Sequence, residues 1–316
     1  MNDTNTSVSN FVLSCLKEIE EKELAGAIFI IIYLVTIFGN TMVIVIIITD
    51  HQLQRPMFLC ITVLSLIDLT CSTTIVLKIL AILLFNNNLI SHSGCLAQMF
   101  ILHHMEALEI FLLTLMAFDR YVAINDPLRY PAVITNKVIL ASIAGINVLG
   151  VILVMVYMFF AETFNFCSTN ILPYCFCDFT AMLRTACLED TRYIIYTSTL
   201  SAIFIVFTFL LIVFSYAKII LLALKMSSAD GKKKALSTCV THLSVVGLFY
   251  FPLIFIYVVP TSRQPASSTV ASSMIMVSTI MPPMLNPLIY SLRNKEIKQS
   301  IQKAVKRKRV TTFIFN

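Results

Sequence analysis

Charged residues are scarce in this chain of 316 residues. Asp, Glu, Lys and Arg make up 13% of it, about half of what is typical of a soluble domain, whereas apolar residues make up 58%. This balance argues against a soluble protein, because long apolar runs belong in lipid rather than in one oversized core. Low-complexity stretches and long linkers are also missing, so the sequence gives no sign of two separate domains.

Motifs for chemistry are missing as well. The sequence has no nucleophile–base pair and no metal-binding motif, which argues against an enzyme. Its last apolar segment contains no lysine that could form a Schiff base, so a light-sensing opsin is not expected. It has no inverted internal repeat of the kind found in transporters. Its basic residues are scattered over several segments, so we do not expect nucleic acid as a partner.

The chain does contain seven apolar segments, each long enough to supply the ~20 residues that cross a bilayer. They cover 24–48, 57–85, 95–121, 138–160, 193–224, 235–259 and 266–290. Backbone polar groups in hydrocarbon must pair internally, and a helix achieves this within one segment. The expected fold class is therefore an all-α membrane protein, a seven-transmembrane helix bundle.

The basic residues predict the orientation of this bundle. Most Lys and Arg lie in alternate connections and in the C-terminal tail, and cytoplasmic segments carry such an excess. The N-terminus is therefore expected outside the cell, and the net charge of +6 is expected to face anionic inner-leaflet lipid. The first residues lack the basic and apolar regions of a signal peptide, so the first apolar helix is expected to direct insertion.

The seven segments divide the chain into three parts. Residues 1–23 are expected to form an extracellular tail, with N-glycosylation triplets at Asn2 and Asn5. Residues 24–290 form the seven-transmembrane domain. Residues 291–316 form a cytoplasmic tail, in which Leu292, Ile297 and Ile301 recur among basic residues at helical spacing. This pattern predicts a short amphipathic helix lying on the membrane.

Five of the nine cysteines are expected on the oxidising, outer side, where disulfides persist. They are Cys95, Cys167, Cys175, Cys177 and Cys187. We expect one bridge between Cys95 and the long outer loop and a second within that loop, although the sequence does not fix the partners. A zinc site at Cys175 and Cys177 is disfavoured because no histidine pair accompanies it. Cys60, Cys71 and Cys239 are expected to fill apolar space, and Cys15 lies in the tail.

Several motifs occur in a fixed order along these segments. They are Gly39-Asn40, Pro56-Met-Phe-Leu59 with Leu64-Ser-Leu-Ile-Asp68, residues 116–124 (MAFDRYVAI), Pro127-Leu-Arg-Tyr130, residues 234–242 (KALSTCVTH) and residues 283–296 (PMLNPLIYSLRNKE). Through them the chain resembles a rhodopsin-like class A G-protein-coupled receptor, and within that family an olfactory receptor, over nearly its whole length.

Two features depart from that resemblance. The chain has no tryptophan, whereas the family usually has one in the fourth helix, near Ile143. In the second intracellular loop, Asn125 and Asp126 stand where a cysteine and a basic or aromatic residue are more usual. The first departure concerns local packing and the second leaves the strength of G-protein coupling open.

The resemblance implies a function. It implies a receptor at the plasma membrane, in the cilia of olfactory neurons, that binds a small odorant in the outer half of the bundle. It further implies activation of a stimulatory heterotrimeric G protein, which raises cAMP. The alternative is a non-olfactory class A receptor for an amine or another small ligand. The resemblance also implies the bridges Cys95–Cys177 and Cys167–Cys187, which leaves Cys175 as the extra cysteine.

Two sets of site residues are carried over from the resemblance. The ligand would contact apolar residues with a few polar anchors, namely Met99, Leu102, His103, Glu106, Ala107, Leu200, Ser201, Phe204, Tyr250, Leu253, Ile254, Tyr257, Met276 and Thr279. For each of them, packing between helices is an equally good explanation. The G-protein switch would comprise Asp119, Arg120, Tyr121, Tyr216, His242, Asn286, Pro287 and Tyr290, with Pro287 loosening its helix by removing a backbone donor.

Ionisable residues inside a membrane are costly, so each suggests a function. Asp68 and Glu109 lie at matching depths, and the resemblance implies a sodium ion between them; otherwise one is protonated and bonds Asn40 or Asn286. Glu106 has two interpretations. It either pairs with Lys78, or, with His103 beside it, anchors a cationic ligand.

Overall fold

The structure is a computed structural model, and the residues described here are 9–14, 20–166, 169–187, 192–257 and 268–314. Their helices are α1 (Lys22–Thr49), η1 (His51–Leu53), α2 (Pro56–Phe85), α3 (His92–Asn125), α4 (Tyr130–Val133), α5 (Asn136–Glu162), α6 (Phe179–Thr185), α7 (Arg192–Lys225), α8 (Ala229–Tyr257), α9 (Ser268–Arg293) and α10 (Lys295–Ile314). Their strands are β1 (Asn10–Leu13), β2 (Leu89–Ser91) and β3 (Ile171–Leu172).

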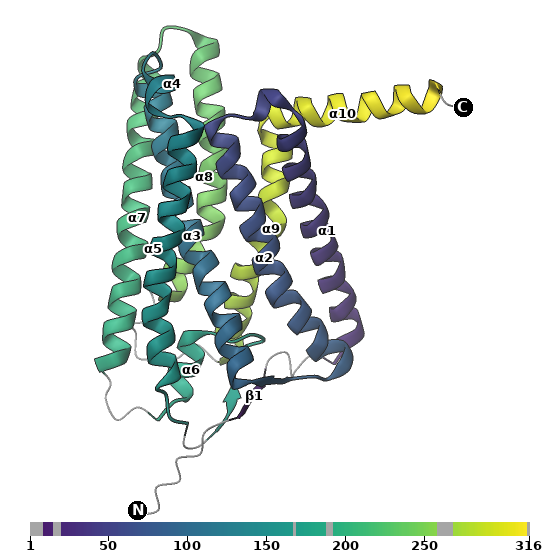
Figure 1. The fold of residues 1–316 in the computed structure, drawn as a ribbon, viewed down its shortest axis with the longest axis vertical. Coiled ribbons are helices and arrows are strands. Elements are labelled where there is room, and N and C mark those ends of the chain that lie inside the picture. Colours follow the sequence, from purple (N-terminus) through teal and green to yellow (C-terminus); the bar gives the residue numbers. More distant parts are fainter. Residues whose placement is uncertain (1–8, 15–19, 167–168, 188–191, 258–267, 315–316) are drawn as a thin grey trace, which may run out of the picture.

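The long helices α1, α2, α3, α5, α7, α8 and α9 run side by side and form a bundle (Figure 1). The shortest, α9, has 26 residues, which at 1.5 Å per residue exceeds the ~30 Å hydrocarbon core of a bilayer. One end of the bundle carries α4 and α10, and we call it the α10 end. The other end carries the three strands and α6, and we call it the sheet end.

The described part of each apolar segment expected from the sequence falls on one long helix. Within the described residues, five stretches are by themselves long and apolar enough to cross a membrane. They are Lys22–Thr49, Pro56–Phe85, Asn136–Glu162, Thr199–Lys225 and Ile275–Arg293. α8 has a shorter apolar stretch, Cys239–Ile254. α3 carries acidic residues and contacts α2, α5, α7 and α8, and an inner position of this kind is where membrane helices tolerate polar groups. The structure is thus the expected helical membrane bundle.

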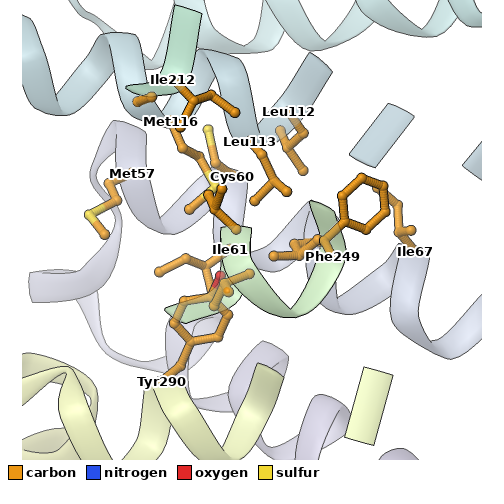
Figure 2. Packing of buried hydrophobic residues seen from close by; sticks show 14 of the residues in the cluster. Met57, Cys60, Ile61, Ile67, Leu112, Leu113, Met116, Ile212, Phe249 and Tyr290 are labelled. Carbon is orange, nitrogen blue, oxygen red and sulfur yellow. The ribbon is translucent and has the colours of Figure 1, made fainter. Parts of the chain in front are cut away.

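The core forms two clusters stacked along the bundle. One fills the α10-end half, where side chains from α2, α3, α7, α8 and α9 meet. Figure 2 shows members of this cluster, including Cys60, Ile61, Met116, Ile212 and Tyr290. The other cluster fills the sheet-end half and includes residues of the loop between α5 and α7. The first cluster contains the switch candidates Tyr216 and Tyr290 and the ligand candidates Tyr250 and Leu253, and the second contains Met99 and Leu102.

A three-stranded sheet at the sheet end was not expected from the sequence. β1 is its central strand, antiparallel to β2 and parallel to β3. Successive residues of a strand face opposite sides, and Phe11 and Leu13 both point inward and are fully buried. Phe11 packs edge-on against Phe166 of the loop between α5 and α7, at 4.9 Å between ring centroids. Part of the expected N-terminal tail is therefore built into the fold.

α10 meets the bundle through specific polar contacts. Asn294 caps the helix, because its Oδ1 accepts from the backbone N–H groups of Glu296 and Ile297. Glu296 forms an ion pair with Arg55 at 2.6 Å. The Ser300 hydroxyl donates to Asp50, and this hydrogen bond holds the pKa of the Asp50 carboxyl below its ordinary value. The expected amphipathic helix is present and is anchored beside η1.

Gly39 allows α1 to lie against α9, and we predict that Gly39→Ala destabilises the protein. An added Cβ would lie 2.9 Å from Cγ and 3.1 Å from Cβ of Pro287, and a proline ring cannot rotate away. Overpacking of this kind typically costs ~1–3 kcal/mol. Gly145→Ala is the matched control, because no atom lies within 4 Å of its added Cβ. The apparent Tm in detergent should fall for Gly39→Ala and not for Gly145→Ala; equal Tm values would contradict this prediction.

Candidate functional site

Asp119 is the most enclosed charge at the α10 end of α3, and its side chain is 0% exposed. Arg120 Nη2 lies 2.6 Å and Nε 2.8 Å from Asp119 Oδ2. The Tyr130 hydroxyl of α4 donates to the other carboxylate oxygen at 2.8 Å. Burial and the charge of Asp119 raise the pKa of the Tyr130 phenol above its ordinary value, so Tyr130 remains a hydrogen-bond donor. Both oxygens of Asp119 are thereby occupied.

A cavity of about 230 Å³ lies beside this pair. Its lining includes Arg120 and Tyr130, Ser237 and Thr241 of α8, and Arg293 at the end of α9. The Arg120 guanidinium is therefore held by Asp119 on one side and borders open space on the other.

A second polar contact joins α7 to α8. The Tyr216 hydroxyl and His242 Nδ1 lie 2.5 Å apart, and their rings stack with centroids 5.3 Å apart. Both side chains are buried. Tyr290, also expected in the switch, lies in the same core cluster, and its buried hydroxyl has no hydrogen-bond partner among the described residues. Tyr121 packs against the cluster from its edge.

Asp68 and Glu109 lie near the middle of the bundle. Asn286 Nδ2 lies 3.2 Å from each carboxylate oxygen of Asp68, while Asn40 bonds the Pro283 carbonyl instead, at 2.9 Å. In the described part of the chain, Glu109 Oε1 and the side-chain oxygens of Asn40 and Asn286 are buried without a hydrogen-bond partner. Oxygen atoms of this type suit a hard cation, although no group of three His, Cys, Asp or Glu residues that could hold a metal occurs among the described residues.

The expected ligand residues lie in the sheet-end half and towards the middle of the bundle. Met99, Leu102, Tyr250 and Leu253 are buried. The half-buried ones are His103, Glu106, Ala107, Leu200, Ser201, Phe204, Ile254, Met276 and Thr279. Tyr257 ends α8 and its side chain is not among those described. The group is thus mostly apolar, with His103, Glu106 and Ser201 as polar members.

Two further polar residues join this group and were not expected from the sequence. Asp178 caps α6 by accepting from the Ala181 N–H at 3.1 Å, and its Oδ2 lies 3.8 Å from His103 Nε2. Tyr157 of α5 bonds Ser201 at 3.0 Å. The position of Asp178 next to Cys177 could have signalled it, because a bridge to Cys95 brings that loop onto α3.

The loop between α5 and α7 is fastened to α3 by a disulfide and by an amide. Cys95 and Cys177 are bonded, with Cα atoms 5.3 Å apart. Gln98 accepts from the Cys177 N–H at 2.9 Å and donates to the Thr74 carbonyl of α2. Cys175 takes part in a disulfide, so the expectation that it is left over is wrong. Cys187 also takes part in a disulfide, and its expected bridge to Cys167 stays a prediction. Cys167 and the glycosylation triplets at Asn2 and Asn5 lie outside the described residues.

Lys78 does not pair with Glu106. Its ammonium donates to the Asn87 and Leu89 carbonyls, at 3.1 and 2.7 Å, because free carbonyls follow the end of α2 and attract a cation. Among the described residues, no ion pair and no hydrogen bond holds the Glu106 carboxylate. Of its two interpretations, the ion pair is therefore wrong, and the ligand anchor stays a prediction.

Comparison with known proteins gives one consistent result. The family model described as "Olfactory receptor" matches residues 29–308. The chain is 41% identical to human "Olfactory receptor 8H1" over 305 residues, which cover 96% of this chain and 97% of that protein. It is 39% identical to chimpanzee (Pan troglodytes) "Olfactory receptor 1E1" over 314 residues, 98% of each chain. Gorilla "Olfactory receptor 1E2" is 39% identical over 310 residues, 96% of this chain and 97% of that protein.

Proposed function

This chain belongs to the olfactory receptor family, and from that premise we propose that it detects odorants and activates a stimulatory heterotrimeric G protein, which raises cAMP. As a member, it is a multi-pass receptor of the plasma membrane and not an enzyme. We place the α10 end in the cytoplasm, because Lys and Arg concentrate at the start of α8 and in α10. The sheet end then faces outward, with Asn2 and Asn5 as glycosylation sites, in the cilia of sensory neurons.

One observation carries the coupling proposal, namely the Arg120–Asp119–Tyr130 contact at the edge of a cavity. In the ligand-free receptor the contact keeps Arg120 turned towards Asp119. Activation moves the α10 end of α8 away, and Arg120 then faces the G protein. Tyr216 and Tyr290 support it there, and the Tyr216–His242 contact acts as a latch between α7 and α8. Pro287 next to Asn286 makes α9 locally deformable.

The ligand drives this change only if it binds the active arrangement more tightly than the inactive one. Its site is the sheet-end group around Met99, Leu102 and Met276, an apolar lining with few polar anchors. We assign the anchoring role to Glu106, since no ion pair among the described residues holds its carboxylate. A carboxylate without an ion-pair partner in an apolar setting favours a cationic ligand, such as a protonated amine.

Expression with a cAMP reporter tests this function. The receptor should respond to members of an odorant panel that includes amines, acids and neutral compounds. The response should disappear in Arg120→Ala at equal surface expression, because that variant lacks the group offered to the G protein. A response to a peptide hormone and to no odorant would contradict the proposal, as would full signalling by Arg120→Ala.

We also propose a sodium ion at Asp68 and Glu109. The buried oxygens without donors on Glu109, Asn40 and Asn286 support this proposal, since a cation would satisfy them and reduce the repulsion between the two carboxylates. The ion would favour the inactive arrangement.

This proposal predicts a specific response to sodium. Ligand-linked stabilisation is about 1.4 kcal/mol at a sodium concentration ten times its Kd, so the apparent Tm of the purified receptor should be higher in NaCl than in choline chloride. Asp68→Asn should remove that difference. Glu106→Gln, one turn away on α3, should retain it. Identical Tm values in the two salts for the unsubstituted protein would refute the ion.

A further inference from the structure

A second, open cavity at the α10 end adjoins the cavity beside Arg120 and shares Ser237 and Arg293 with it. It has a volume of about 500 Å³ and lies between the first turns of α8 and the last residue of α9. Its charged lining is Lys232 and Lys233 from α8 and Arg293 from α9. Leu236, Ser237 and Val240 continue the same face of α8, at the spacing that places residues above one another on a helix. We call this cavity the basic groove.

The basic groove gathers positive charge without a counterion. No acidic residue is among its described lining residues. Asp230 precedes Lys232 on α8 but is exposed and outside the lining. Two other cations at this end are paired, Arg55 with Glu296 and Arg120 with Asp119. Three like charges from two adjacent helices repel one another, so an anion between them would stabilise this arrangement.

The apolar side of the groove indicates that this anion belongs to a membrane lipid. Val240, at the far end of the lining from Lys232, is 49% exposed, and Leu292, next to Arg293, is 67% exposed. Exposed apolar side chains of a membrane protein face lipid, so the groove joins a basic end to a lipid-facing end. A phospholipid has this same order, with its phosphate in the headgroup and its chains in the bilayer.

We infer that the basic groove binds the headgroup of a polyphosphorylated inositol lipid of the inner leaflet. Each phosphomonoester carries ~1.5–2 negative charges near neutral pH, so two of them match three cations better than the single net charge of phosphatidylserine. The Ser237 hydroxyl lies on the lining as an additional donor. The inference rests on the proposed cytoplasmic placement of the α10 end. Bound there, the lipid would link the start of α8 to the end of α9.

Native mass spectrometry of the purified full-length receptor tests this inference with phosphatidylinositol 4,5-bisphosphate as the probe. One lipid should bind, and Lys232→Gln/Lys233→Gln/Arg293→Gln should weaken binding roughly 100-fold, since each basic residue near a membrane contributes about a fivefold factor. Arg293→Gln alone should weaken it about fivefold. The matched control is Lys298→Gln/Lys303→Gln/Lys306→Gln on α10, which removes the same charge and should retain binding.

Several outcomes would overturn the inference. Equal loss of binding in the α10 control would show that the lipid binds at α10, or that binding depends only on the total positive charge. Binding of phosphatidylserine with equal affinity would exclude selection for phosphomonoesters. Equally tight binding of soluble inositol trisphosphate would show that the apolar end takes no part. The measurement requires neither odorant nor G protein, so its failure is distinguishable from failure of the proposed signalling.

Discussion

Asp119→Asn should raise the ratio of active to inactive receptor in the absence of ligand roughly 10- to 100-fold. Ligand-independent cAMP production should rise with this ratio. The substitution keeps an oxygen that accepts from Tyr130 but removes the charge that holds Arg120 at 2.6 Å. Hydrogen bonds to charged groups contribute ~1.5–3 kcal/mol, and each 1.4 kcal/mol changes an equilibrium tenfold. Because Asp119 is fully enclosed, solvent does not screen this interaction as it screens surface pairs. Basal reporter activity per receptor at the cell surface is the measurement.

Asp126→Asn is the matched control for this prediction. Asp126 also pairs with an arginine, Arg129, but at 3.7 Å and with both side chains well exposed. Such exposed pairs contribute little, so basal signalling should remain at the level of the unsubstituted receptor. If Asp119→Asn and Asp126→Asn gave the same basal signal, the Asp119–Arg120 pair would not be the restraint proposed here.

What could be predicted from the sequence depends on the range of each interaction. The long helices follow from apolar segments, because the bilayer alone sets their length. The stretch 116–130 predicted Asp119 beside Arg120, since neighbours in one motif stay close in any fold. It did not predict that Tyr130 turns back to bond Asp119, because that contact depends on the geometry of α4.

Long-range contacts account for most of the unexpected features. β1 is too short to be recognised by its pattern, and it exists because β2 and β3 flank it with backbone hydrogen bonds. Asp178 reaches His103 only because the loop is fastened to α3 by Cys95 and Gln98. The depth of Lys78 on α2 suggested Glu106 as its partner, yet the nearer carbonyls after α2 bind its ammonium. Helical spacing predicts depth in a bundle, but it does not predict which of several polar groups a flexible side chain selects.

Because Lys78 bonds those carbonyls, it does not occupy the Glu106 carboxylate, which can then bind a ligand. Replacing Glu106 is therefore expected to give the second large effect. Glu106→Gln should weaken the response to protonated amine odorants more than 100-fold, because removing one partner of a buried charge pair typically costs ~3–5 kcal/mol. Responses to neutral odorants of the same shape, such as the corresponding alcohols, should change little, since glutamine has nearly the same volume. Concentration–response curves in the cAMP assay provide the measurement.

Two variants distinguish the anchor from other carboxylates at the sheet end. Glu162→Gln makes the same substitution at an exposed position at the end of α5 and should leave amine potency unchanged. Asp178→Asn retains an oxygen that can cap α6 but removes the charge near His103. If Asp178→Asn abolished the amine response and Glu106→Gln did not, the cation would be bound by the loop rather than by α3. If neither variant changed the potency ratio of amine to alcohol, the receptor would not recognise its ligands by positive charge.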